Sequence, residues 1–184
     1  ALRCVGFLAF DVVLRRAKVA RMSVACELGY EINCSSAEHI TLRRLLLEAG
    51  ADLGIREYGF NALLSLRLEK SFGIWSAEFT QGYTPGQTGM DRWIAWDKGD
   101  FVGREAAIRE RDGNGPAQLV VTLEVEAADA DASGYEPVWS GDHKVGFVTS
   151  GGYGHSTGKS LAMAMVDREV AAEGTDLKVH IVGV

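Results

Sequence analysis

The chain has 184 residues, of which 47% are apolar and 24% are charged, and its formal net charge is −6. This composition excludes collagen-like, low-complexity and disordered chains. The negative charge disfavours nucleic acid and anionic membrane surfaces as partners, because their phosphate groups would be repelled.

The N-terminal region and the cysteines predict a cytoplasmic protein. The apolar run Val5–Phe10 is followed by Asp11 and lacks the pattern of a cleaved leader. No stretch reaches the roughly 18 consecutive apolar residues that a membrane-spanning helix needs. The three cysteines, Cys4, Cys26 and Cys34, are odd in number and form no CxxC pair, which predicts a free thiol and no cysteine metal site.

The first third of the chain predicts a hairpin followed by two helices. Extended patterns at Lys18–Ala25 and Tyr30–Cys34 flank a turn-prone segment. Ser35 and Glu38 have the spacing of a capping box ahead of the first helix, and the second helix is expected from Phe60 to about Lys70. The apolar positions of the first helix are Leu42, Leu45, Leu46 and Ala49.

The middle of the chain contains a long loop between Gly73 and Asp91 that carries three aromatic residues. Such a loop either faces a ligand or packs on its own rings. After it we expect a short strand at Trp93–Trp96 and a helix at Phe101–Arg111.

A cluster of turn formers at Asp112–Pro116 predicts a domain boundary, because the pattern then changes to short strands. Gly-rich turns separate these strands, as in a small barrel or sandwich. The expected strands are Leu119–Glu126, Lys144–Thr149, Lys159–Val166 and Leu177–Val182, with a hairpin turn at Ser140–Asp142.

Several patterns resemble ligand sites without meeting their requirements. Gly158–Ser160 matches the end of a phosphate-binding loop, but the glycine required five positions earlier is Tyr153. The glycines near it form no dinucleotide fingerprint, so no flavin or nicotinamide site is predicted. No metal site is predicted either, because the four histidines have no cysteine or carboxylate at ligand spacing: His39, His143, His155 and His180.

Two carboxylates and one thiol beside the predicted turn have open roles. Either Glu27 or Glu31 projects into a cleft, or both are solvated surface groups. Cys26 is either a nucleophile or a structural thiol. A carboxylate in a cleft could accept two parallel N–H bonds from a ligand with an amino group beside a ring N–H.

Five segments in one order carry a family resemblance. They are Cys26–Glu31, Ala62–Lys70, Asp97–Glu105, Val148–Gly151 and Gly158–Ala162. Together they resemble the folate-binding aminomethyltransferase family. That family includes the aminomethyltransferase of the glycine cleavage system and the C-terminal part of dimethylglycine and sarcosine dehydrogenases.

The resemblance is greater to the dehydrogenase branch, because of Ser65–Trp75 and Thr84–Arg92. Glycine-cleavage members usually carry arginine where this chain has Leu63. The resemblance implies tetrahydrofolate as the cofactor and a small amine-derived donor of the one-carbon unit. N5 of the folate would capture that unit to give methylenetetrahydrofolate.

The resemblance also implies roles for particular residues. Glu31 matches the carboxylate that holds the pterin through its 2-amino and N3–H groups. Arg67 and Glu69 are expected to be structural or positioning residues. The other expected folate-binding residues are Tyr30, beside Glu31, and Trp75 and Tyr83, which are expected from their place on the long loop and their ring chemistry rather than from the resemblance.

Departures from the family pattern leave enzyme activity of the chain alone open. Val24 and Cys26 stand where the family usually has tyrosine and glycine. The aspartate central to the transfer lies in a family segment upstream of this sequence, so no catalytic residue is expected in the chain. The flavin domain of the dehydrogenases has no counterpart here.

These observations predict an α+β chain. Residues 1–112 would form a ferredoxin-like folate-binding region that is incomplete at its N-terminus, and residues 113–184 a small Greek-key barrel. The expected function is one-carbon transfer to tetrahydrofolate. The alternatives are a non-catalytic interaction module or dehydrogenase remnant whose truncated edge docks on a partner chain or second copy, and a folate protein of RNA modification.

Overall fold

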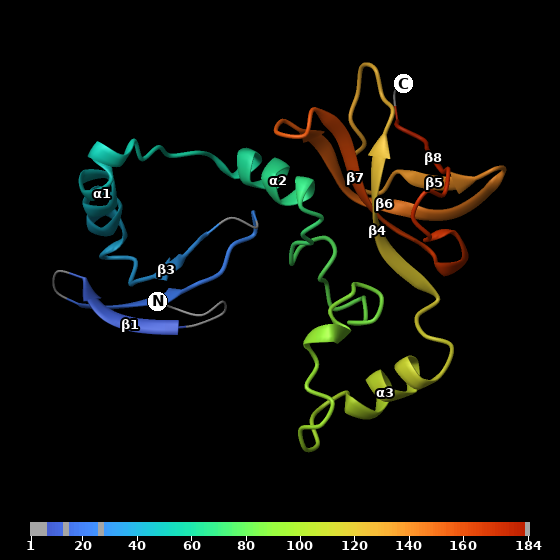
Figure 1. Cartoon of the computed structure of the whole chain (residues 1–184), viewed down its shortest axis with the longest axis horizontal. Helices are drawn as coiled ribbons and strands as arrows, with labels where there is room; N and C mark the ends of the chain where they lie inside the picture. The colour runs from blue at the N-terminus through green and yellow to red at the C-terminus, as the bar shows by residue number, and fades with distance from the viewer. Residues whose placement is uncertain (1–6, 13–14, 26–27, 183–184) are drawn as a thin grey trace. The chain divides into compact units, whose positions relative to one another are not determined.

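The computed structural model describes residues 7–12, 15–25 and 28–182, with side chains from residue 17 onward. These residues form helices and two separate antiparallel sheets (Figure 1). The chain divides into two units, one ending at Lys70 and the other beginning at Ser71. The separate antiparallel sheets confirm the predicted α+β class. The domain boundary expected near residue 112 stays a prediction.

The first unit contains a three-stranded sheet in the order β1, β2, β3. Its strands are β1 (Phe7–Val12), β2 (Arg15–Ala20) and β3 (Glu31–Asn33). Antiparallel pairing of Val19 with Ile32 confirms the predicted hairpin, with strands shorter than expected. Strand β1 was not predicted, because a short apolar run has no period that distinguishes a strand from a buried helix segment.

The helices of the first unit follow its sheet. They are α1 (His39–Ala49), the 3-10 turn η1 (Ala51–Leu53) and α2 (Phe60–Glu69). Both predicted helices are confirmed, but the capping box is not formed. The Ser35 hydroxyl donates to the Glu38 carboxylate at 2.5 Å, and α1 begins only after Glu38. Within the described ranges, no helix combines the length and apolar character needed to cross a membrane.

The second unit begins with a long irregular segment. The strand expected at Trp93–Trp96 is wrong: a 3-10 turn, η2 (Asp91–Trp93), occupies its start, and Ile94 N–H donates to the Asp91 carbonyl at 3.0 Å. Two tryptophans around two small or branched residues fit such a turn as well as a strand. The predicted helix is confirmed as α3 (Arg104–Asp112), which starts after Gly103 at φ 87°.

Five antiparallel strands form the sheet of the second unit, in the order β4-β7-β6-β5-β8 (Figure 1). They are β4 (Gln118–Val125), β5 (Pro137–Ser140), β6 (His143–Gly154), β7 (Lys159–Asp167) and β8 (Lys178–Val179), and the 3-10 turn η3 (Arg168–Val170) follows β7. Strands β5, β6 and β7 pair in sequence order, and β4, which precedes them in the chain, lies beside β7. This is the expected Greek-key order. Among the described residues no pairing joins β4 to β8, so strand pairing does not close a barrel.

The core of this sheet is built from small and branched side chains. On β7, Ala162, Ala164 and Val166 alternate along one face and pack with Val138 and Val148 of the neighbouring strands. Met163 and Met165 occupy the opposite face and are also buried. Because both faces of β7 are covered, its sequence is an almost continuous apolar run rather than an alternating one.

Glycines let the β6–β7 hairpin form. Gly151–Gly154 belongs to β6 itself, and Gly158 turns the chain at φ 69°, so the segment that resembles a phosphate loop is a hairpin arm. Gly146 faces Val166 across the ladder, and a Cβ at Gly146 would overlap the Met165 carbonyl oxygen. The close approach of the two backbones therefore requires a residue without a side chain.

Replacing Gly146 should destabilise the second unit without changing its fold. We expect Gly146→Ala to lower the free energy of unfolding by about 1–3 kcal/mol, because the added methyl group meets backbone atoms that cannot rotate away. The measurement is urea unfolding followed by circular dichroism. Gly99→Ala is the control, since a Cβ there has no atom within 4 Å; equal losses in the two variants would contradict the explanation.

Candidate functional site

Glu31 and Tyr30, the expected pterin-binding residues of the first unit, lie at the start of β3. The Glu31 side chain is exposed, and its Oε1 accepts a hydrogen bond from Asn33 Nδ2 at 3.0 Å. Tyr30 is 52% exposed. The described residues of the first unit do not enclose this carboxylate, which keeps lone pairs available for a ligand. Cys26 and Glu27, the other candidates at this bend, lie outside the described residues.

Arg67 and Glu69, the expected structural residues, lie in the last turn of α2. Arg67 is 3% exposed and Glu69 is half-buried. A guanidinium group is buried to this degree only with hydrogen-bonding partners, so the burial is consistent with a structural or positioning role. That role stays a prediction.

Trp75 and Tyr83, the expected aromatic residues, lie on the irregular segment that opens the second unit. Trp75 is 75% exposed, whereas Tyr83 is half-buried. Burial raises the pKa of the Tyr83 phenol, and the nearby Tyr135 and Glu78 raise this pKa further. Trp75 thus presents its ring to solvent, while the Tyr83 phenol is kept neutral through the physiological range.

Glu78 fixes this segment to the sheet, and sequence reasoning missed it. Its side chain is fully buried. One carboxylate oxygen accepts hydrogen bonds from the Thr149 and Ser150 hydroxyls at 2.6 and 2.5 Å, and the other accepts from Ile74 N–H at 3.0 Å. Gly73 makes room for it, since a Cβ there would lie 2.8 Å from the Glu78 Cβ.

The hydroxyl pair that meets Glu78 lies at an irregularity in β6. The register of the β6–β7 ladder shifts between Val148 and Ser150. In a regular strand, neighbouring side chains point to opposite faces. The shift lets the consecutive hydroxyls of Thr149 and Ser150 reach one carboxylate oxygen, an arrangement typical of a bulge that re-aims a side chain.

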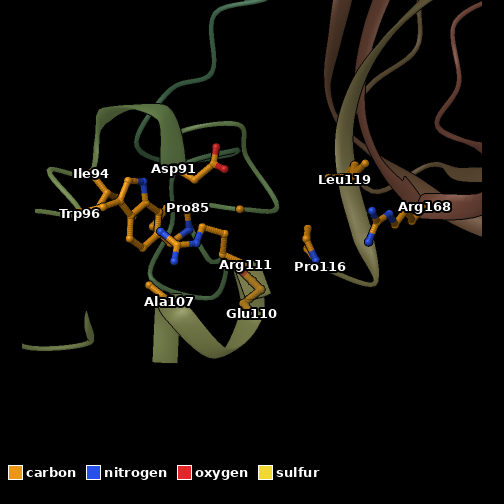
Figure 2. Close-up of a pocket in the computed structure, with 11 residues that line it drawn as sticks. Pro85, Asp91, Ile94, Trp96, Ala107, Glu110, Arg111, Pro116, Leu119 and Arg168 are labelled. Atoms are coloured by element: carbon orange, nitrogen blue, oxygen red, sulfur yellow. The ribbon is translucent and has the colours of Figure 1, made fainter. Parts of the chain in front are cut away.

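A cavity of about 220 Å³ lies elsewhere in the second unit (Figure 2). It is bounded by the 85–96 segment, the second half of α3, the start of β4 and η3. Its lining combines apolar side chains with two carboxylates and two guanidinium groups, none of which was predicted as a site residue. The lining residues are Pro85, Gly86, Asp91, Ile94, Trp96, Ala107, Glu110, Arg111, Pro116, Leu119 and Arg168.

A second cavity, of about 460 Å³, borders the 126–131 segment beside Tyr153. Its lining is acidic, and one of its carboxylates, Glu124, pairs with Lys159 at 2.7 Å. No three His, Cys, Asp or Glu side chains gather into a possible metal site anywhere in the described part of the chain. We therefore interpret this acidic lining as solvent-exposed surface, with Glu124 paired to Lys159.

Two family models match the chain. The GCVT N-terminal domain matches residues 1–98, and the glycine cleavage T-protein C-terminal barrel domain matches residues 119–184. The chain belongs to the glycine cleavage T-protein family. The family predicted from the ordered motifs is thereby confirmed, and so is its pairing of an α+β region with a Greek-key C-terminal sheet.

Relatives within this family carry two different names. Mouse mitochondrial dimethylglycine dehydrogenase is 34% identical over 89% of the chain, which covers 19% of that relative. A Bacillus mycoides aminomethyltransferase is 32% identical over 90% of the chain and 45% of the relative. The crystal structure of glycine cleavage system aminomethyltransferase T from Bartonella henselae superposes with a TM-score of 0.79, at 25% identity, over 91% of this chain and 46% of that one. The chain thus spans less than half the length of these relatives.

Removing the Glu78 charge should cost more stability than removing an exposed one. We expect Glu78→Gln to lower the free energy of unfolding by about 1–3 kcal/mol, because the amide turns a donor toward groups that themselves donate. Urea unfolding of the variant measures this loss.

The matched control is Glu124→Gln, which removes a carboxylate from a solvent-exposed ion pair with Lys159. Such pairs contribute little to stability. If Glu78→Gln unfolds at the same urea concentration as Glu124→Gln, the anchoring role of Glu78 is wrong.

Proposed function

We propose that this chain provides folate-binding residues for one-carbon transfer of the aminomethyltransferase type. The observation that carries the proposal is the match of both family models, in order, over most of the chain. The names of the relatives, aminomethyltransferase and dimethylglycine dehydrogenase, support an amine-derived donor. When bound, tetrahydrofolate supplies the N5 nucleophile that takes the one-carbon unit.

The chain's own part in this reaction is binding and orientation. Glu31 holds the pterin edge through two charge-assisted hydrogen bonds; its exposed carboxylate accepts one bond from Asn33 and has further lone pairs to accept them. Tyr30, next to Glu31, contributes aromatic surface to the bound ring. In the second unit, Trp75 and Tyr83 are the aromatic side chains proposed to contact folate. Glu78 limits the movement of the segment that carries Trp75 and Tyr83. No residue of this chain is assigned a catalytic role.

A docking function is the second candidate. Several large apolar side chains of the first unit are exposed, namely Ile40, Leu53, Tyr58 and Phe60. Where exposed apolar side chains form a contiguous patch, that patch usually contacts a partner. Sedimentation distinguishes the two functions: a monomer that binds folate supports one-carbon transfer, whereas a dimer that does not bind folate supports docking.

Glu31 gives the most direct test of folate binding. We expect Glu31→Gln to weaken tetrahydrofolate binding at least tenfold, since losing a charge-assisted pair costs about 1.5–3 kcal/mol. Isothermal titration calorimetry under anaerobic conditions measures the dissociation constant. Glu48→Gln is the control, because Glu48 is an exposed carboxylate on α1. Unchanged affinity in Glu31→Gln would remove the basis of the proposal.

Trp75 provides an optical test of the aromatic contact. We expect bound folate to quench tryptophan fluorescence and Trp75→Phe to lose most of this quenching, because the exposed indole would lie against the pterin. Trp139→Phe, at a half-buried position of β5, should retain the quenching. Equal quenching in both variants would place the folate away from Trp75.

A further inference from the structure

The cavity shown in Figure 2 has four charged side chains on its lining, and three of them have partners. The Thr84 hydroxyl lies 2.8 and 3.0 Å from the two carboxylate oxygens of Glu110. Arg111 donates two hydrogen bonds to Asp112, at 2.6 and 3.1 Å, and lies 4.4 Å from the centre of the Trp96 ring. Arg168 donates through Nη1 to the Asn114 carbonyl.

Asp91 is the exception. It is half-buried in η2, and within the described ranges its carboxylate has no hydrogen bond or ion pair. A carboxylate that is partly removed from water without a partner loses solvation that nothing in the protein replaces. A cationic group in the cavity would replace it.

Arg168 supplies the opposite charge from a different element. Among the described residues, only its Nη1 has a hydrogen-bond partner, which leaves Nε–H and the second amino group as donors. Gly115, at φ 70°, makes this placement possible, because a Cβ there would lie 2.5 Å from Nη1. Figure 2 shows Asp91 and Arg168 on separate walls of the cavity, with Leu119 on the strand beside Arg168.

The lining restricts the ligand's overall charge. Two carboxylates and two guanidinium groups balance in formal charge, so the lining as a whole favours neither an anion nor a cation. Between them lie apolar side chains, including Ile94 and Leu119. A ligand with a positive group, a negative group and a short hydrocarbon chain between them would match the carboxylates, the guanidinium groups and the apolar side chains of the lining.

The position of the cavity within the family supports a binding role. The first family model ends at residue 98 and the second begins at residue 119. The lining takes residues from both matches and from α3 between them. The sequence also predicts a domain boundary near residue 112, and small-molecule sites occur preferentially at domain interfaces.

We propose that this cavity binds a small zwitterionic amino acid. Its ammonium group pairs with Asp91, its carboxylate accepts from Arg168, and its carbon chain lies against Ile94 and Leu119. This site is separate from the residues proposed to hold folate, so the inference does not depend on the proposed function.

The test is a titration of the full chain with glycine, β-alanine and γ-aminobutyrate, followed by NMR chemical shifts. Butyrate and butylamine serve as probes that carry only one of the two charges. We expect one amino acid to bind at least tenfold more tightly than either single-charge probe. Equal binding of a single-charge probe, or no saturable binding of any amino acid, would overturn the proposal.

Two charge-removing variants test the assigned contacts. Asp91→Asn keeps the shape of the side chain, and Arg168→Gln keeps a donor for the Asn114 carbonyl; each should weaken amino-acid binding at least tenfold. Arg109→Gln is the control, because Arg109 is an exposed residue of α3 outside the cavity lining. Urea unfolding of each variant confirms that it is folded, and parental affinity in both cavity variants refutes the assignment.

The same samples distinguish this site from the folate site. Glu31→Gln should lose folate binding and keep amino-acid binding, whereas Asp91→Asn should show the reverse. If only the folate result fails, the amino-acid site stands; if only the amino-acid result fails, the proposed function stands.

Discussion

The hydrogen bonds of the buried Glu78 carboxylate are the interaction that holds the irregular segment of the second unit against its sheet. It joins a segment without regular structure to β6, across 71 and 72 residues of sequence. A fully buried carboxylate is tolerated only when its oxygens are hydrogen-bonded, and here three donors meet that requirement. The same three bonds restrict the segment that bears Trp75 and Tyr83.

This anchor in turn depends on how β6 and β7 pair. The shifted register at Thr149 presents two consecutive hydroxyls to one carboxylate, and the covered apolar run of β7 keeps that register in place. Register is strongly specified where side chains are buried, because a slip of one residue exchanges the two faces. The glycines of β6 allow the backbones to approach without side-chain overlap. Packing of the sheet therefore determines where the irregular segment can be held.

The second unit places its charged groups in two different physical settings. Glu78 is fully buried, and its carboxylate accepts hydrogen bonds from three donors of the same chain. Its role is therefore to stabilise the fold. Asp91 and Arg168 border a cavity and keep hydrogen-bonding capacity that the chain does not use. Polar groups that border a cavity and have donors or acceptors left over can bind a ligand. Buried polar groups whose hydrogen bonds are all made within the protein stabilise the fold instead. The match to the T-protein family models concerns whole domains and says nothing of the contacts of Glu78, Asp91 or Arg168.

The sequence alone determined the features that depend on neighbouring residues. The helical period of α1, the alternation along β4 and the turn at Ser140–Asp142 each follow from local spacing. The ordered motifs between Cys26 and Ala162 identified the family. Tertiary structure alone decided that Glu78 meets Thr149 and Ser150, and that Asp91 and Arg168 border one cavity. The Glu78 contacts join residues 71 and 72 positions apart. Hydrophobic periodicity reflects only neighbouring residues, so it cannot predict a contact over that separation. Trp93–Trp96 shows the converse: its run of aromatic and apolar residues favoured a strand, but turn hydrogen bonds formed there instead.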